Sequence, residues 1–149
     1  MSSYPILKCI NITSRHYKMW LASKLKCVNI TTSEYFFLTN TPVDGDITAK
    51  KLCEIIIVDP ALGTRTINTL VDKGYLVKVR NLDDKREFRI SLTPAGITVR
   101  SKIIGLIDEY NNGIKSCFTK EQYEQLYDMT NALLEYSIAM NKDGGVDHE

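Results

Sequence analysis

Apolar residues recur at helical spacing in the first part of the chain. Between Tyr4 and about Lys26 they are separated by three, four or seven residues, which returns each to the same side of an α-helix. The residues in this pattern are Leu7, Ile10, Tyr17, Leu21 and Leu25, with Trp20 beside them. A short second helix is predicted through residues 35–38, YFFL, with Thr32 or Ser33 as its N-cap.

Two further helices with clear capping signals occupy the middle of the chain. The first is predicted over residues 49–57, AKKLCEIII, and the second over residues 60–73. The expected boundary residues are Asp46 or Thr48 as the first N-cap, Asp59 and Pro60 at the start of the second helix, and Gly74 after its end. Two helices joined by so few residues are typical of a helix-turn-helix.

The periodicity changes from helical to alternating after Gly74. Residues 75–80, YLVKVR, and residues 85–93, KREFRISLT, are predicted as two strands joined by the polar turn NLDD. A hairpin that directly follows a helix-turn-helix is the wing of a winged helix.

Two long helices are predicted after the hairpin. Thr93 and Pro94 begin the first, and Thr119 with Gln122 begins the second as a capping box. Their apolar stripes are Ile97, Ile103, Ile107, Tyr110 and Ile114 in the first, and Tyr123, Leu126, Leu133, Leu134 and Ile138 in the second. The predicted fold class is therefore mainly α with a small β-hairpin wing (α+β), a winged helix-turn-helix flanked by long helices.

These elements are predicted to form one structural domain with distinct regions. Residues 29–93 hold the winged helix-turn-helix, which we expect to bind DNA. Residues 1–28 and 94–141 form a helical region that we expect to make a homodimer, because three long apolar stripes exceed what a small winged domain can cover. Residues 142–149 are predicted to be a disordered tail.

The net charge of the chain is +1, but the charges are unevenly distributed. Residues 1–33 contain five Lys or Arg residues and no acidic residue, whereas residues 108–149 contain nine acidic and three basic residues. The part before Asp108 therefore carries a net charge of about +7. This distribution suits contact with phosphate by that part of the chain.

The sequence argues against several other classes of protein. No apolar run approaches the roughly 18 residues needed to cross a bilayer, and the first residues lack the features of a signal peptide, so we expect a cytoplasmic protein without membrane association. There is no glycine-rich phosphate loop, HExxH or GxSxG motif, so we expect neither enzyme activity nor a cofactor. No CxxC pair is present, so we expect no metal site and no disulfide framework, but reduced and partly buried thiols at Cys9, Cys27, Cys53 and Cys117.

Residues 52–93 resemble, without a gap, the core of the MarR family of winged-helix regulators. The landmarks that carry the resemblance are Leu52, Thr64, Arg65, Leu70, Gly74, the wing signature Asp84-Lys85-Arg86, the segment Ser91-Leu92-Thr93 and Gly96. The sequence departs from the family pattern at Cys53, where the family has Ala, at Ile57, where it usually has Gly, and at Asp59, where it often has Ser. The resemblance implies a bacterial-type, dimeric transcriptional regulator, such as a repressor, that binds double-stranded DNA.

The helix over residues 60–73 is the expected recognition helix, because the major groove admits one helix. Its expected contact residues are Pro60, Ala61, Leu62, Thr64, Arg65 and Asn68, opposite a core face of Gly63, Ile67, Leu70 and Val71. Arg65 either contacts guanine, or only binds a phosphate or pairs with a neighbouring acidic residue. Thr48 and Thr64 either donate to phosphates or serve only in capping and solvation, and the helix amino ends are expected to add backbone donors.

The wing supplies a second group of candidate contacts. Lys85 and Arg86 follow the turn, where a basic tip can enter the minor groove, and the resemblance assigns this role to Arg86. Asp84 is expected to hold the loop by accepting hydrogen bonds. The alternative is that this charged tip is only a solvated loop. One such unit contacts few bases, which favours a two-fold dimer on a pseudo-palindromic operator.

The resemblance also implies release by a small aromatic or lipophilic effector, bound between the dimer helices and the winged region. The candidate effector residues, for which packing in the core or the interface is the alternative, are His16, Trp20, Tyr35, Phe36 and Arg80. A second hypothesis is a thiol-based redox sensor of the same fold, with Cys9 as its candidate. A third is a winged-helix module that binds only proteins, since a fold alone does not fix a function.

Overall fold

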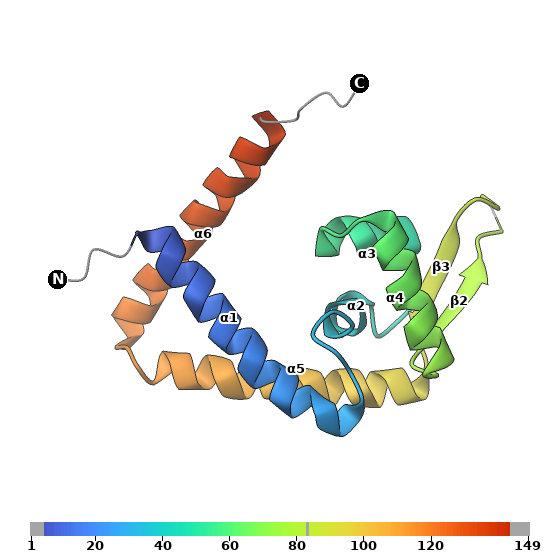
Figure 1. The fold of residues 1–149 in the computed structure, drawn as a ribbon, viewed down its shortest axis with the longest axis horizontal. Helices are drawn as coiled ribbons and strands as arrows, with labels where there is room; N and C mark the ends of the chain where they lie inside the picture. The colour runs from blue at the N-terminus through green and yellow to red at the C-terminus, as the bar shows by residue number, and fades with distance from the viewer. Residues whose placement is uncertain (1–4, 83, 144–149) are drawn as a thin grey trace. The chain divides into compact units, whose positions relative to one another are not determined.

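The computed structural model describes residues 5–82 and 84–143 of the chain, the last two of them by their backbone alone. The chain divides into two compact units, Met1–Ile107 and Asp108–Glu149. Figure 1 shows the elements of both. They are, in order, α1 (Ile6–Leu25), the 3₁₀ turn η1 (Lys26–Val28), α2 (Tyr35–Asn40), β1 (Ile47–Thr48), α3 (Ala49–Ile56), α4 (Pro60–Asp72), β2 (Leu76–Arg80), β3 (Phe88–Leu92), α5 (Pro94–Lys115) and α6 (Lys120–Asp143).

Most of the predicted helix starts are confirmed by their capping hydrogen bonds. The hydroxyl of Thr48 accepts from the Lys51 amide at the start of α3, and the hydroxyl of Thr93 accepts from the Gly96 amide, 2.9 Å away, at the start of α5. At α6, the Thr119 and Gln122 side chains cap each other's backbone amides. These bonds join residues three positions apart, so the sequence alone contains both partners.

The start of α2 and the end of α3 differ from the prediction. Neither Thr32 nor Ser33 caps α2, because a capping box forms one residue earlier, at Thr31: the Thr31 amide donates to the Glu34 carboxylate and the Glu34 amide donates to the Thr31 hydroxyl. The helix α3 ends at Ile56, and Ile57 takes a left-handed conformation with φ 60°. A left-handed residue at this position closes a helix, and glycine adopts it most easily.

The wing contains a third strand that the sequence did not predict. The sheet order is β1-β3-β2, with β3 antiparallel to both neighbours, Ile47 opposite Ile90, and Arg80 opposite Phe88. The strand β1 has only two residues, which are too few to show an alternating pattern in the sequence. Asp46, one of the two candidate caps of α3, instead forms an ion pair with Arg89 of β3 at 2.6 Å.

The core of the first unit joins the second half of α1 to the winged helix-turn-helix and the first half of α5. Its buried apolar residues are Leu21, Leu25, Ile30, Tyr35, Phe37, Leu38, Leu52, Ile67, Leu70, Leu76, Ile90, Val99 and Ile103. Gly96 permits a close approach of α5 to the hairpin, because a Cβ there would collide with the backbone carbonyl of Tyr75. The core thus fixes α4 and the hairpin relative to each other.

The second unit contains the end of α5 and the helix α6. Many large apolar side chains of α6 are exposed: Leu126, Tyr127, Met129, Leu133, Leu134, Tyr136, Ile138 and Met140. The helix continues to Asp143, two residues into the predicted tail, and residues 144–149 lie outside the described part. Among the described helices, none is long and apolar enough to cross a membrane.

Candidate nucleic-acid interface

The helix α4 has the two faces that the sequence predicted, with one addition. Gly63, Ile67 and Leu70 are buried and Val71 is partly buried, while the outer residues are exposed: Pro60, Ala61, Leu62, Thr64, Arg65 and Asn68. Thr66 is also buried, and its hydroxyl donates to the carbonyl of Leu62. The hydroxyl is therefore satisfied inside the helix, which allows a polar residue on the inner face.

The start of α4 is closed by its own cap. A carboxylate oxygen of Asp59 accepts from the amides of Ala61 and Leu62 at 2.9 and 3.2 Å. The Gly63 amide donates to the Asp59 carbonyl. The expectation that this amino end offers free donors to phosphate is wrong, because the first amides already have partners and a negative charge lies beside them.

Arg65 is exposed on the outer face of α4. Its Nε lies 3.4 Å from the carbonyl of Ala61, one turn earlier, and among the described residues it has no acidic partner. Its guanidinium is not neutralised by a neighbour, which was one of the alternatives for this residue. The exposed Thr64 precedes it, and Thr48 accepts a capping bond while its own proton stays available.

The loop of the wing is held by Asp84. Its carboxylate accepts from the Arg86 amide at 2.9 Å, and its carbonyl accepts from the Glu87 amide at 3.0 Å. This is the geometry that the expected role of Asp84 requires. Lys85 and Arg86 follow with exposed side chains, and no ion pair links either to another described residue.

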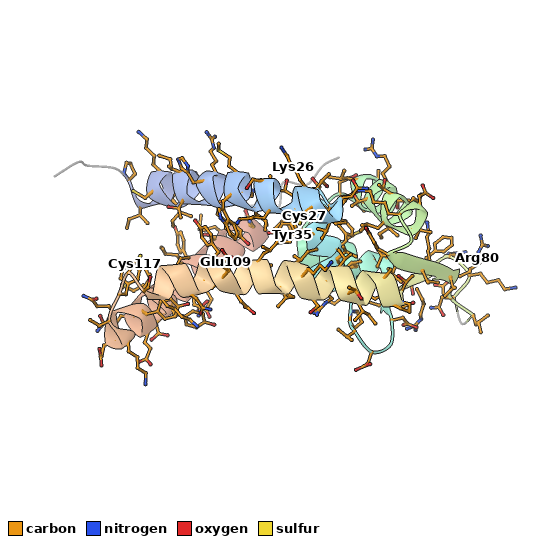
Figure 2. All side chains as sticks on the ribbon, turned by 90° about the horizontal axis from the view of Figure 1, so that it is seen from below. Lys26, Cys27, Tyr35, Arg80, Glu109 and Cys117 are labelled. Atoms are coloured by element: carbon orange, nitrogen blue, oxygen red, sulfur yellow. The ribbon has the colours of Figure 1, made fainter. Side chains whose placement is uncertain are left out.

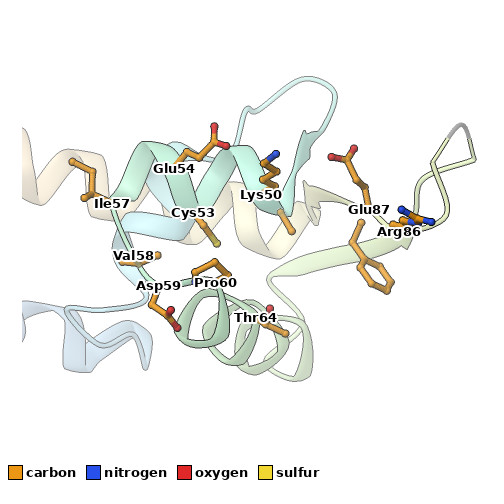
Figure 3. Close-up of a pocket in the computed structure, with 12 residues that line it drawn as sticks. Lys50, Cys53, Glu54, Ile57, Val58, Asp59, Pro60, Thr64, Arg86 and Glu87 are labelled. Atoms are coloured by element: carbon orange, nitrogen blue, oxygen red, sulfur yellow. The ribbon is translucent and has the colours of Figure 1, made fainter. Parts of the chain in front are cut away.

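A cleft of about 880 Å³ runs between α3, the start of α4 and the wing (Figure 3). Pro60 and Thr64 of α4 and Arg86 of the wing line it, so the structure brings three of the predicted contact residues to one site. Lys50 of α3 lines it as well and was missed by the sequence analysis. Acidic side chains of Glu54, Asp59 and Glu87 share the lining, so they outnumber the two cations, Lys50 and Arg86.

Lys78 is a second cation that the sequence analysis missed. Its Nζ donates to Oδ1 of Asn68 at 2.9 Å and lies 4.4 Å from the centre of the Phe88 ring. It therefore links the recognition helix to both strands of the hairpin. No local pattern could reveal this contact, because Lys78 and Asn68 lie in different elements.

The thiol of Cys53 is buried where α3 meets α4. A Cβ at Gly63 would collide with its Sγ, so the two helices approach closely at this point. Burial, and then the negative charge of Asp59, raise the pKa of the Cys53 thiol. A thiol with a raised pKa is a poor nucleophile at neutral pH.

Comparison with known proteins identifies the family to which this chain belongs. The family model described as "Transcriptional regulator SarA/Rot" matches residues 20–103, more than half of the chain. The chain belongs to the SarA/Rot family of transcriptional regulators. It is 26% identical over 129 residues to the HTH-type transcriptional regulator BilQ of Clostridioides difficile (strain CD3), and the match covers 87% of each.

Solved structures of similar fold come from the MarR group. A MarR transcriptional regulator from Methanosarcina mazei Go1 matches with a TM-score of 0.83 and 22% identity, covering 91% of this chain and 97% of that one. The S. aureus MepR–DNA complex matches with a TM-score of 0.82 and 19% identity, covering 90% and 99%. The predicted fold class and the resemblance to MarR regulators are confirmed, and the SarA/Rot-family chain is a transcriptional regulator, not an enzyme.

The five candidate effector residues of this SarA/Rot-family protein do not meet in one place. Tyr35 is buried near α1, where burial and then Tyr17 raise the pKa of its hydroxyl, and Phe36 lies against it with ring centres 4.0 Å apart. Arg80 lies away from Tyr35, on the hairpin (Figure 2), beside the Phe88 ring. The remaining two lie on α1, His16 exposed and Trp20 partly buried.

The cysteines are more exposed than the sequence predicted. Cys9, Cys27 and Cys117 are exposed free thiols, and only Cys53 of the four is buried. The sequence overestimates their burial, because helical periodicity does not show which helices lack a covering neighbour. Within the described ranges, no group of three His, Cys, Asp or Glu side chains is placed to hold a metal ion.

Proposed function

We propose that this regulator binds a pseudo-palindromic operator as a homodimer and represses transcription. Each copy lays α4 in the major groove and its wing in the neighbouring minor groove. The observation that carries the proposal is the shared cleft, in which Thr64 of the recognition helix and Arg86 of the wing face one space. At this side of the cleft a hydroxyl and a guanidinium can contact the same nucleic-acid backbone, whereas acidic side chains line the remainder.

Only a few positive charges are available for this contact, and they lie on α4 and the wing. Arg65 on α4 and Lys85 and Arg86 on the wing are exposed and have no acidic partner among the described residues. Arg65 can donate twice to guanine O6 and N7, which gives base selection, while the wing cations supply phosphate and minor-groove contact. A module that binds only proteins has no need of this arrangement.

The dimer is proposed from the apolar side chains that the chain leaves uncovered. Ile6, Leu7 and Ile10 are exposed at the start of α1, and α6 exposes eight large apolar residues in the other unit. Apolar surface of this extent on a single chain marks an interface. A second copy is the proposed partner, because a two-fold dimer doubles the bases that are read. The helical region of residues 1–28 and 94–141 is the proposed source of this interface.

Release by a small apolar effector is proposed at a cavity of about 250 Å³ beside α4. Phe36 and Phe37 of α2 line it together with Leu62 and Thr66 of α4. An occupant that contacts α4 directly can shift the population away from the conformation that binds DNA. Oxidation of the exposed Cys9 is the alternative trigger, and replacement of Cys9 by Ser separates the two.

Selection of bound sequences from random duplex DNA tests the proposal. We expect a two-fold motif whose half-sites lie about 10 base pairs apart, since both recognition helices then meet one face of the duplex. The Arg65→Ala/Arg86→Ala double variant is the control and should enrich nothing. A wild-type protein that enriches no motif, or one motif without two-fold symmetry, contradicts the proposed operator and favours the protein-binding module.

A further inference from the structure

The contact between Lys78 and Asn68 bears on which base the recognition helix prefers. We propose that Lys78 binds the carbonyl oxygen of the Asn68 side chain, so that Asn68 turns its N–H donors outward and selects guanine over adenine. The inference rests on the proposed docking of α4 in the major groove. It assigns Lys78 as a positioning residue and Asn68 as the residue that touches the base.

The orientation of the Asn68 amide follows from the chemistry of its partner. An ammonium group has three donors and no acceptor, so the atom that faces it at 2.9 Å must be the oxygen. The NH₂ group of Asn68 is thereby turned away from Lys78. Within the described part of the chain, no hydrogen bond of this NH₂ group to a protein atom is found.

Lys78 is itself held in place. It lies on β2 opposite Ile90, which makes Phe88 its diagonal neighbour across the hairpin. Its Nζ lies 4.4 Å from the centre of the Phe88 ring, a cation–π distance, and its side chain is partly buried. A lysine with two contacts on a paired strand loses less conformational freedom on binding than an unattached surface lysine.

Asn68 is placed to meet a base. It is exposed and lies one turn beyond Thr64 and Arg65 on the outer face of α4. A free Asn side chain prefers adenine, because its oxygen accepts from N6 while its NH₂ donates to N7. With one lone pair of the oxygen bound to Lys78, and the positive charge of that ammonium facing the N6 donor, the first of these two bonds is weakened.

Guanine fits the amide that remains. Its major-groove edge offers two acceptors, O6 and N7, and no donor. The NH₂ group of Asn68 can donate to this edge, and the positive charge of Lys78 behind it favours the same acceptors. Cytosine, whose N4 group is a donor, is opposed by both.

The test compares base preferences of variants in selections from random duplexes. The Asn68→Ala variant first identifies the operator position that Asn68 contacts. It is the position at which the wild type selects a base and this variant does not. At that position we expect guanine with the wild type. In Lys78→Met the released oxygen should shift the preference toward adenine, by roughly 5- to 150-fold relative to guanine.

Lys85→Met is the matched control, because it removes one wing cation without touching Asn68. It should lower affinity for all sequences and leave the base at that position unchanged. A wild type that already prefers adenine there, a Lys78→Met variant that keeps guanine, or an Asn68→Ala variant that loses no preference overturns the inference. Failure of the wild type to enrich any motif is a different result, which overturns the proposed function and this inference with it.

Discussion

The ammonium of Lys73, at the end of the recognition helix, lies 2.9 Å from both carboxylate oxygens of Glu34. The same ammonium donates to the carbonyl of Asn29, and Glu34 accepts from the Thr31 amide. The pair thus ties the end of α4 to the loop between α1 and α2. Together with the shared apolar core, this contact holds the recognition helix against the segment that follows α1.

Replacing Glu34 by Gln should lower the free energy of unfolding by roughly 3 kcal/mol at neutral pH, because Lys73 then keeps a partly buried charge without a countercharge. Burial raises the pKa of Glu34, but the hydrogen bond and charge of Lys73 and the bonds to Thr31 outweigh it, so the pKa is lowered from 4.5. A lowered folded pKa gives stability that is complete above about pH 4.5 and is lost as the pH falls through the folded value.

Urea unfolding of the wild type and Glu34→Gln between pH 7 and pH 3 measures this difference. The gap between the two proteins should be widest near neutral pH and should narrow below pH 4.5. The exposed pair Lys51 and Glu54, at 3.6 Å, provides the control, and Glu54→Gln should change stability by less than about 1 kcal/mol. A gap that is independent of pH would show that the charge of Glu34 does not contribute.

Replacing Ile57 by Gly should stabilise the fold by about 1 kcal/mol, since Ile57 holds a left-handed conformation that costs a β-branched residue energy. Its side chain is 87% exposed, so little packing is lost. Thermal or urea unfolding measures the change. Gly74, with φ 75° and open space around it, gives the reciprocal test: Gly74→Ala should destabilise by a similar amount. If Ile57→Gly and the wild type are equally stable, the left-handed conformation of Ile57 does not destabilise the fold.

The two arginines of the interface should differ in their effects on DNA binding. Arg86→Ala should weaken binding to all duplexes and reduce the slope of log affinity against log salt by about one unit. Arg65→Ala should also relax base preference, at a cost of roughly 1–3 kcal/mol on the preferred sequence. Fluorescence anisotropy on selected and scrambled duplexes at several salt concentrations separates them. Two variants that bind both duplexes as the wild type does would refute the docking.

The proposed dimer should dissociate when a charge is placed on the exposed apolar side of α6. Leu134, which is 57% exposed in the single chain, would bury an unpaired carboxylate at the interface if replaced by Glu. Sedimentation should then show a monomer, and operator affinity should fall by about 100-fold or more, because one half-site binds alone. Gln125→Glu adds the same charge at an exposed polar position and should remain dimeric. A dimeric Leu134→Glu protein would place the interface elsewhere.

Much of the candidate site could be read from the sequence, because it depends on local chemistry. The caps at Thr48, Asp59 and Thr93 involve partners two or three residues away. The inner and outer faces of α4 follow from helical periodicity in the same way. The left-handed turn at Ile57 was an exception, because isoleucine itself does not indicate that conformation; only the glycine that the family usually has there does.

The tertiary structure decided the relationships between elements that are distant along the chain. It showed that Arg80 lies apart from Tyr35 and that β1 joins β3 through Ile47 and Ile90. It also placed Lys78 against the side chain of Asn68. Periodicity reports which face of an element is apolar, but not which other element that face meets. The sequence by itself therefore determined a winged helix-turn-helix with a basic wing, and packing decided which of its polar side chains are already bound by other parts of the protein.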